Sequence, residues 1–272
     1  MSRILALAAA ELRIAARNRW VVIAVAMMAL FSLALAAAGS APTGALGADR
    51  LSVVVASLTS LAVYLVPLVA LLMSFDAVAG EVERGTLPLL LTYPVSRAQV
   101  LAGKFVAHLS ILTLAIAVGY GLAAGAALLV DPLAGRGVPA LFRLGWTSVL
   151  LGASFLGAGY LASSLARRPS GAAGMAIGIW LVAVVLYDLA LLGLIVSRGG
   201  EALGAALPAA LLANAADAFR LYNLGASGAT AAASGIGGAA ASIPGWQALT
   251  SLVLWPLAML ALAVTAFRRV TP

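Results

Sequence analysis

Hydrophobic residues fill six long stretches of this chain, and short polar segments separate them. The stretches lie near residues 20–38, 53–75, 106–130, 141–165, 172–196 and 247–267. Each is long enough to cross a bilayer as an α-helix, which takes about 20 mostly apolar residues. The pattern predicts an all-α, polytopic membrane protein with six transmembrane helices, organised as a single transmembrane domain over 1–272.

A basic segment, residues 3–19, precedes the first stretch. At 100° per residue Arg3, Arg13 and Arg17 fall on one side of a helix. The apolar residues on the other side are Ile4, Leu5, Leu7, Ala8, Leu12 and Ala15. This pattern predicts an amphipathic helix lying on the inner leaflet, with its arginines toward lipid phosphates. A plain basic flank without such a helix is the alternative.

The segment 75–105, between the second and third stretches, is rich in charged and turn-forming residues. Thr86 is placed to cap a short helix that has Pro88 in its first turn, and Tyr93-Pro94 would end that helix. Ser96 is then expected to cap the helix that enters the third stretch. A short surface helix held between two spans can receive force from a soluble partner and pass it to both.

The long segment 197–246 lies between the fifth and sixth stretches. Its polar and aromatic part, near 214–223, is predicted to be a folded outer element, and a glycine- and alanine-rich tract follows it at 225–242. A disordered linker is the alternative, because loops of this length are uncommon in compact proteins.

Two features inside the predicted spans are informative. Asp188, in the fifth stretch, is expected to form a structural ion pair with Arg143 near the outer end of the fourth. Glycines four residues apart, at 121 and 125 and at 174 and 178, indicate close packing of helices inside the protein.

Composition places the protein in a bilayer. The chain is 64% hydrophobic and 9% charged, and its mean hydropathy is +1.11. A soluble domain usually carries about 25% charged residues. A net charge of +7 would suggest nucleic acid in a soluble protein, but here the basic residues stand in short groups between apolar stretches. We expect no nucleic-acid partner.

The distribution of lysine and arginine predicts the orientation. With the N-terminus inside, eleven of the 16 basic residues fall in cytoplasmic segments and five in outer segments. This bias places both termini in the cytoplasm of a bacterium, with the chain in its inner membrane.

The residues that carry chemistry are few. The chain has no cysteine and one histidine, His108, without an acid and a nucleophile beside it in sequence. It also lacks the GxxxxGK[ST] loop that binds ATP, so hydrolysis is expected in another subunit. We predict no catalytic residue, no metal ligand and no cofactor in this chain. Copper transport through the spans is poorly supported, because only His108 and six methionines could serve as ligands.

The 75–105 segment resembles the ABC-2 type permeases. The matching residues are Glu81, Glu83, Gly85-Thr86-Leu87, Pro94-Val95-Ser96-Arg97 and Gly103-Lys104. The resemblance implies that a short coupling helix docks on a separate cytoplasmic ABC ATPase, which binds ATP and Mg. The residues it implies for that contact are Glu81, Glu83, Arg84, Gly85, Thr86, Leu87, Leu89, Leu90, Pro94, Arg97 and Lys104.

Further motifs are similar to the ABC-2 permeases that serve copper-site maturation of nitrous oxide reductase. These are Leu90-Leu91-Thr92-Tyr93-Pro94, Gly103-Lys104-Phe105-Val106 with His108, and Ala216-Asp217-Ala218-Phe219-Arg220-Leu221. The resemblance implies a homodimer, two ATPase copies and a periplasmic copper-handling partner, with the reductase as a further candidate. It implies that Asp217, Phe219, Arg220 and Tyr222 contact the periplasmic partner.

Two other functions stay open at this stage. A general ABC-2 exporter of drugs, lipid or polysaccharide would share the same architecture. An ion-driven carrier would need acids or bases within its spans, and Asp188 alone qualifies clearly.

Overall fold

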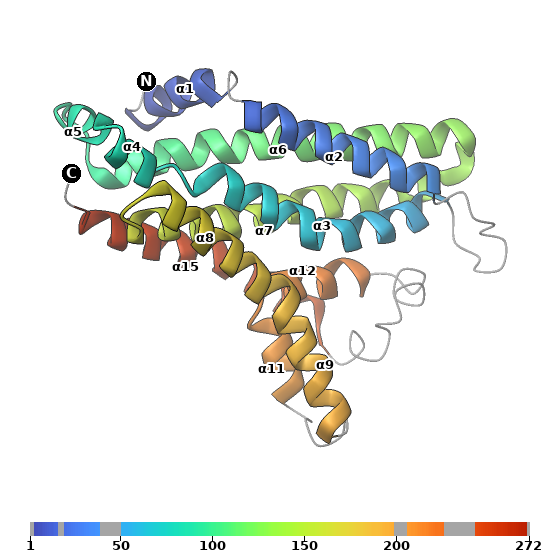
Figure 1. The fold of residues 1–272 in the computed structure, drawn as a ribbon. Helices are drawn as coiled ribbons and strands as arrows, with labels where there is room; N and C mark the ends of the chain where they lie inside the picture. The colour runs from blue at the N-terminus through green and yellow to red at the C-terminus, as the bar shows by residue number, and fades with distance from the viewer. Residues whose placement is uncertain (1–2, 16–18, 39–49, 199–205, 226–242, 271–272) are drawn as a thin grey trace.

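The computed structural model describes residues 3–15, 19–38, 50–198, 206–225 and 243–270, and within these ranges every regular element is a helix (Figure 1). In chain order the first elements are α1 (Arg3–Ala15), α2 (Arg19–Ala38), α3 (Arg50–Ser74), α4 (Ala79–Glu83), α5 (Thr86–Leu91) and α6 (Arg97–Val130). The remaining elements are η2 (Pro132–Gly137), α7 (Val138–Leu165), α8 (Pro169–Trp180), η3 (Leu181–Leu186), α9 (Tyr187–Arg198), α11 (Ala206–Leu212), α12 (Ala215–Leu224) and α15 (Gly245–Arg268).

Five helical segments are long and apolar enough to cross a membrane. They are Leu51–Glu83, Arg97–Val130, Gly135–Leu165, Pro169–Ser197 and Gly245–Arg268. The first predicted stretch forms the 20-residue α2, within which Val25–Ala37 is a shorter apolar helix. The predicted all-α, multi-pass fold is confirmed, and the number of six spans stays a prediction.

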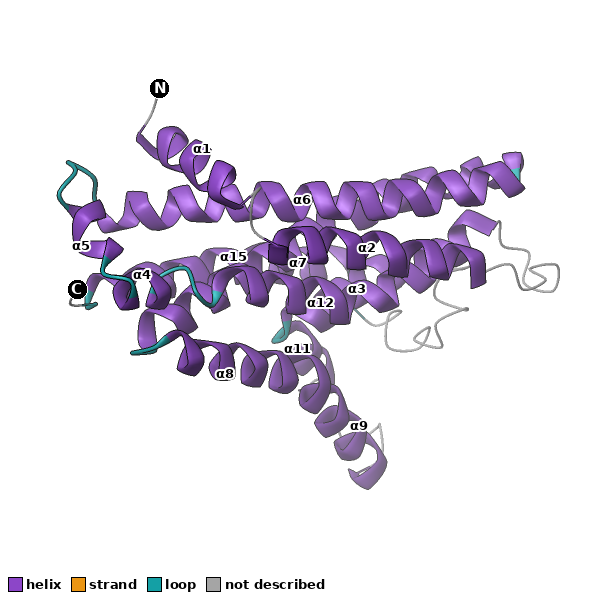
Figure 2. Ribbon diagram, turned by 45° about the horizontal axis from the view of Figure 1, so that its top comes forward, coloured by secondary structure: helices purple, strands orange, loops and turns teal. Residues whose placement is uncertain are grey.

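The long helices form one bundle around α7. This helix packs along α15, α3 and α6, while α2 lies along α6 and also contacts α3, and α1 lies across the start of α6 (Figure 2). Glycine permits the close approach of α7 to α15: a Cβ at Gly157 would lie 2.8 Å from the Cβ of Met259 on α15. The buried face of α7 includes the fully buried Leu151, Leu156 and Tyr160.

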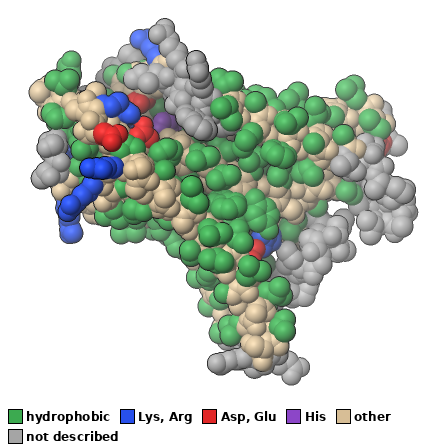
Figure 3. All heavy atoms as spheres, in the orientation of Figure 1, with side chains coloured by type: hydrophobic (Ala, Val, Ile, Leu, Met, Phe, Trp, Pro, Cys, Tyr) green, Lys and Arg blue, Asp and Glu red, His purple; other side chains and the backbone are tan. Residues whose placement is uncertain are grey.

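Both termini lie at one end of the bundle, together with α4 and α5 (Figure 1). On the face seen in Figure 3, lysine and arginine side chains gather at this end, and hydrophobic side chains cover most of the remaining surface. This distribution suits a protein whose long sides contact lipid and whose charged end contacts water.

The fifth predicted span bends away from the bundle. The chain runs continuously through α8, η3 and α9, and α11 returns toward the bundle beside it (Figure 1). The most apolar stretch of this span is only 6% buried, against 22–78% in the other four. Among the residues that the structure describes, no atom beyond the local helix backbone lies within 4 Å of a Cβ built at Gly174, Gly178, Gly121 or Gly125, so the predicted internal packing at these glycines is wrong.

The predicted outer element forms α12, and α12 packs on the bundle. It contacts α15, α3 and α7 along its length, and eight of its ten residues are buried. The N-cap of α12 is Asn214, whose side chain accepts the Ala216 N–H at 3.0 Å. The glycine- and alanine-rich tract that follows lies largely outside the described residues.

Candidate functional site

The helices α4 and α5 form a short hairpin between α3 and α6. Its first turn is anchored to α7, because the Ser163 hydroxyl accepts the backbone N–H groups of Val78 and Ala79 at 2.9 and 3.0 Å. Gly85 then reverses the chain between the two helices with φ 67° and ψ 17°. Such left-handed geometry is where glycine is favoured. Thr86 was predicted to cap α5, but Gly85 occupies the N-cap and Thr86 begins the helix.

The apolar residues of α5 divide between two surfaces. Leu87 is fully buried in the chain's own core, whereas Leu89 is 66% exposed. Tyr93, just beyond the helix, is 67% exposed. Leu87 therefore cannot take part in docking a partner, contrary to the prediction, because its side chain is already covered. Leu89 and Tyr93 are the exposed large apolar side chains of this region.

The polar residues of the hairpin divide between exposed and partly buried positions. Glu83, Arg84 and Thr86 are exposed, as is the apolar Pro94 beyond α5, and Arg84 forms a surface ion pair with Asp76 at 3.1 Å. Ion pairs this exposed contribute little to stability.

The start of α6 is fixed by two sets of contacts. Ser96 and Gln99 form the predicted cap as a reciprocal capping box: the Ser96 hydroxyl accepts the Gln99 N–H, and the Gln99 side chain accepts the Ser96 N–H. Arg97 donates hydrogen bonds to the carbonyls of Phe267 and Val270, and its guanidinium lies 5.6 Å from the centre of the Phe267 ring. Arg97 thereby ties the coupling segment to the end of α15.

A buried lysine connects the hairpin to α1. The Lys104 Nζ lies 2.5 Å from Glu11 Oε1 on α1 and 2.7 Å from Glu81 Oε1 on α4. Lys104 is only 5% exposed. We call these three residues the Lys104 joint. They bring together helices that are far apart in sequence, and Glu81 and Lys104 face each other instead of facing out toward a partner.

The close approach of α1 to α6 depends on a glycine. A Cβ at Gly103 would lie 2.7 Å from the Cβ of Leu7 on α1. Below the joint, His108 stacks on Tyr160 with their rings 11° from parallel, and His108 Nδ1 lies 2.7 Å from the tyrosine hydroxyl. His108 is therefore an imidazole packed inside the bundle. Sequence analysis missed Glu11, although it is the one acid in the basic N-terminal segment.

A second charged cluster ties α12 to the fifth span. Arg220 Nη2 lies 2.9 Å from Asp188 Oδ2, and Arg220 Nη1 lies 3.3 Å from Asp217 Oδ1. The predicted pair between Asp188 and Arg143 is wrong. The Arg143 guanidinium instead donates to the Asn223 carbonyl at 3.5 Å. Arg220 lies on α12, which folds back onto the bundle and so brings the Arg220 guanidinium next to Asp188.

Burial has two consequences in this second cluster. Asp217 is 2% exposed, and burial, together with the Asp188 carboxylate, raises the pKa of Asp217 to about 7, although Arg220 opposes the rise. Phe219 is fully buried as well. These two residues cannot contact a periplasmic partner as predicted, because the bundle covers them. Arg220 and Tyr222 remain partly exposed.

The described part of the chain holds no group of three or more histidine, cysteine, aspartate or glutamate side chains arranged to bind a metal ion. Its charged clusters consist of carboxylates neutralised by lysine or arginine. Their geometry suits mechanical connection between helices.

Comparison with known proteins agrees with this architecture. The profile described as "ABC-2 family transporter protein" matches residues 5–271, nearly the whole chain. The chain belongs to the ABC-2 family of transporter proteins. Within this ABC-2 permease, the profile covers both the α4–α5 hairpin and α12.

Two curated relatives of this ABC-2 permease bear the same name. The chain is 45% identical over 263 residues to the "Probable ABC transporter permease protein NosY" of Pseudomonas aeruginosa, with 95% of each chain covered. It is 41% identical over 273 residues to the protein of that name from Stutzerimonas stutzeri, with 99% of each chain covered.

Proposed function

We propose that this ABC-2 permease transmits the work of a separate cytoplasmic ATPase across the membrane to a periplasmic event, the copper-site maturation of nitrous oxide reductase. The observation that carries the proposal is the α4–α5 hairpin, which presents exposed apolar side chains at the charged end of the bundle. The family of ABC transporter permeases supports an ATPase partner, and the NosY relatives support the maturation role.

The hairpin offers a small docking surface. Leu89 and Tyr93 supply apolar contacts, and Glu83 and Arg84 supply exposed charges around them. An apolar centre with a polar rim is the usual composition of a protein–protein interface, and this patch has that composition. The orientation follows, since this end of the bundle and both termini would then lie in the cytoplasm.

The Lys104 joint is the route by which movement would leave the hairpin. Glu81 is on α4, Glu11 is on α1 and Lys104 is on α6. A buried ion pair resists separation, because pulling one partner away leaves the other charged and without water. A displacement of α4 by the ATPase is therefore passed to α1 and to α6 together.

A homodimer is part of the proposal. The span formed by α8, η3 and α9 is apolar, has a most apolar stretch only 6% buried in the chain, and carries Gly174 and Gly178 with open space beside them. Small residues spaced by four let helix backbones approach closely. A second copy packed on α8 at these two glycines would cover that part of the span and leave η3 facing lipid, and each copy would carry one ATPase on its hairpin.

Co-purification with a cytoplasmic ABC ATPase and a periplasmic accessory protein from the same organism tests the coupling proposal. Leu89→Asp should abolish retention of the ATPase while the permease stays folded, because Leu89 is already exposed. Leu129→Asp is the matched control: Leu129 is 87% exposed near the end of α6 opposite the hairpin. Equal retention of the ATPase by both variants would refute docking at the hairpin.

The maturation role is tested separately in cells. A strain lacking the permease should accumulate nitrous oxide reductase that contains less copper, and the wild-type chain should restore the copper content. Reductase with full copper content in the deletion strain would refute this role and would leave the docking result untouched. ATP-driven uptake of radiolabelled copper by the complex in liposomes would show transport of copper instead of transmission of force.

A further inference from the structure

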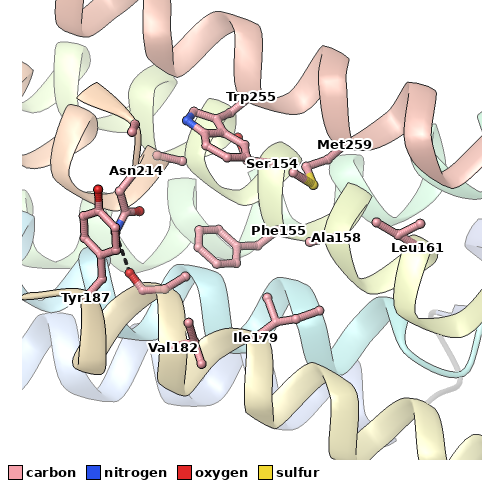
Figure 4. Close-up of a pocket in the computed structure, with 13 residues that line it drawn as sticks. Ser154, Phe155, Ala158, Leu161, Ile179, Val182, Tyr187, Asn214, Trp255 and Met259 are labelled. Atoms are coloured by element: carbon pink, nitrogen blue, oxygen red, sulfur yellow. Dashed lines mark hydrogen bonds between the residues drawn. The ribbon is translucent and has the colours of Figure 1, made fainter. Parts of the chain in front are cut away.

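A cavity of about 390 Å³ lies away from the hairpin, between α7, η3, the turn joining α11 to α12, and α15 (Figure 4). Phe155, Ala158, Ile179, Trp255 and Met259 supply most of its wall. In Figure 4 the aromatic rings of Phe155 and Trp255 lie between η3 and α15, and Leu161 marks one end of the space.

The cavity exists because the fifth span widens into a π-helix at this point. The Tyr187 N–H donates to the Val182 carbonyl, five residues back, and not to Ala183 as it would in an α-helix. The Ala183 carbonyl accepts a hydrogen bond from Asn214 Nδ2 at 2.6 Å. Asn214 thus fixes the α11–α12 turn against η3, which holds the span away from α7. Short π-helical turns inside α-helices recur at functional sites.

The hydroxyl and amide side chains of the wall, those of Ser154, Tyr187 and Asn214, make hydrogen bonds within the chain. The Tyr187 hydroxyl donates to the Ala210 carbonyl at 2.7 Å, and the Ser154 hydroxyl donates to the Leu150 carbonyl at 3.1 Å. Asn214 uses its Nδ2 on Ala183 and its Oδ1 on the Ala216 N–H. A buried water needs about two to four polar partners. The wall is therefore suited to an apolar occupant and not to water or a polar substrate.

The cavity borders the lipid-facing surface of the span. Val182 belongs to its wall and is 56% exposed, and Ile177 and Leu181 beside it on the same span are also exposed. Hydrocarbon of the bilayer therefore reaches the mouth of the cavity. A water molecule's share of liquid volume is about 30 Å³, so the space admits on the order of a dozen methylene-sized groups.

We propose that this cavity binds one hydrocarbon chain of a membrane lipid, which fills the space between the fifth span and α7. The volume matches a large part of one acyl chain, and the apolar wall supplies dispersion contacts along it. The bound chain would support the bent position of α9 and α11. This inference does not depend on the proposed function.

A phospholipid carrying a diazirine near the end of one acyl chain tests the proposal. The complex is placed in nanodiscs that contain this lipid, irradiated, digested and mapped by mass spectrometry. We expect labels on Phe155 and Met259, which face the cavity, in addition to Leu257, which is 61% exposed on the lipid side of α15. Labels on Leu257 with none on Phe155 or Met259 would overturn the proposal.

Filling variants supply the second measurement. Ala158→Phe and the milder Ala183→Leu should each remove the cavity labels and leave the Leu257 label in place. Ala190→Phe, at an exposed position of α9 outside the cavity wall, should change neither. Cavity labels that persist in both filling variants would contradict the proposal. Because the chain has no native cysteine, a disulfide between two copies of Met259→Cys would also overturn it, by showing that a second copy occupies the space.

Discussion

Removing the cation from the Lys104 joint is the sharpest test of how this permease is held together. Lys104→Met keeps most of the side-chain volume but leaves two carboxylates with no positive charge between them. Lys104 is 5% exposed, and the side chains of Glu11 and Glu81 are 20% and 16% exposed. Water can therefore only partly replace the lost ammonium group.

The expected magnitude follows from this burial. Breaking a buried ion pair by removing one partner costs about 3–5 kcal/mol. Here one lysine serves two acids at 2.5 and 2.7 Å, so we expect the upper part of that range. The assay is thermal unfolding of the purified permease, followed by tryptophan fluorescence in detergent at fixed protein and detergent concentration.

A triple variant separates stability from transmission. Replacing Glu11 and Glu81 with Leu in addition to Lys104→Met removes all three charges and leaves an apolar contact of similar size. Apolar replacement of a complete buried ion cluster is often neutral or stabilising. The triple variant should therefore unfold close to the wild-type temperature. Its complex should still bind the ATPase through Leu89, but hydrolysis should no longer respond to the periplasmic partner.

Two outcomes would refute this reasoning. Lys104→Met that unfolds like the wild type would show that the joint contributes nothing to stability. If the triple variant has normal stability and its ATP hydrolysis still responds to the periplasmic partner, movement of the hairpin is transmitted without the Lys104 joint. Lys104→Arg is the control that preserves the charge, and it should fall between the wild type and Lys104→Met because the larger guanidinium must be accommodated.

Three further predictions concern backbone geometry and the second charged cluster. Gly85→Ala should lower stability by about 1–2 kcal/mol, because residue 85 has φ 67° and no neighbour within 4 Å compensates the strain; an unchanged unfolding temperature would contradict this. Arg220→Met should lower the free energy of unfolding by about 3–5 kcal/mol, since it leaves Asp188 and Asp217 without a cation. Arg220→Lys keeps the positive charge and should show a smaller decrease in the same unfolding assay. Stability should also fall as pH rises, because folding raises the pKa of Asp217 from 3.8 to about 7. The stability that Asp217 contributes is fully present below the unfolded pKa and is lost as pH rises to the folded pKa. Unfolding temperatures between about pH 5 and about pH 8 should show this decline in the wild type and a smaller one in Asp217→Asn; equal pH profiles would remove Asp217 as the cause.

Local rules predicted much of the helical framework. The apolar stretches became long helices, because a backbone in lipid must satisfy its hydrogen bonds within its own segment. Ser96 capped α6 as expected, since a capping box needs only residues three positions apart. Thr86 failed as a cap because Gly85, one residue earlier, adopts a left-handed conformation that no short-range rule had assigned to it.

The candidate site was predictable as a region and not as a set of contacts. The segment 75–105 was identified as the coupling element, but its docking side could not be read from its composition. Leu87 and Leu89 are two residues apart on one short helix, and the bundle covers the first and leaves the second exposed. Which side of a short helix faces the core depends on where α1, α6 and α7 lie.

Sequence alone thus determined the membrane environment, the helical segments and the position of the α4–α5 hairpin, because these depend on hydrophobicity and on neighbours along the chain. The tertiary structure alone decided the ion pairs. Lys104 meets Glu11 across 93 positions, and Asp188 meets Arg220 instead of Arg143 because α12 folds back onto the bundle. Tertiary packing also created the cavity beside η3. Which charged groups pair, and where a cavity forms, depends on distances between side chains in three dimensions. Separation along the sequence gives no measure of those distances.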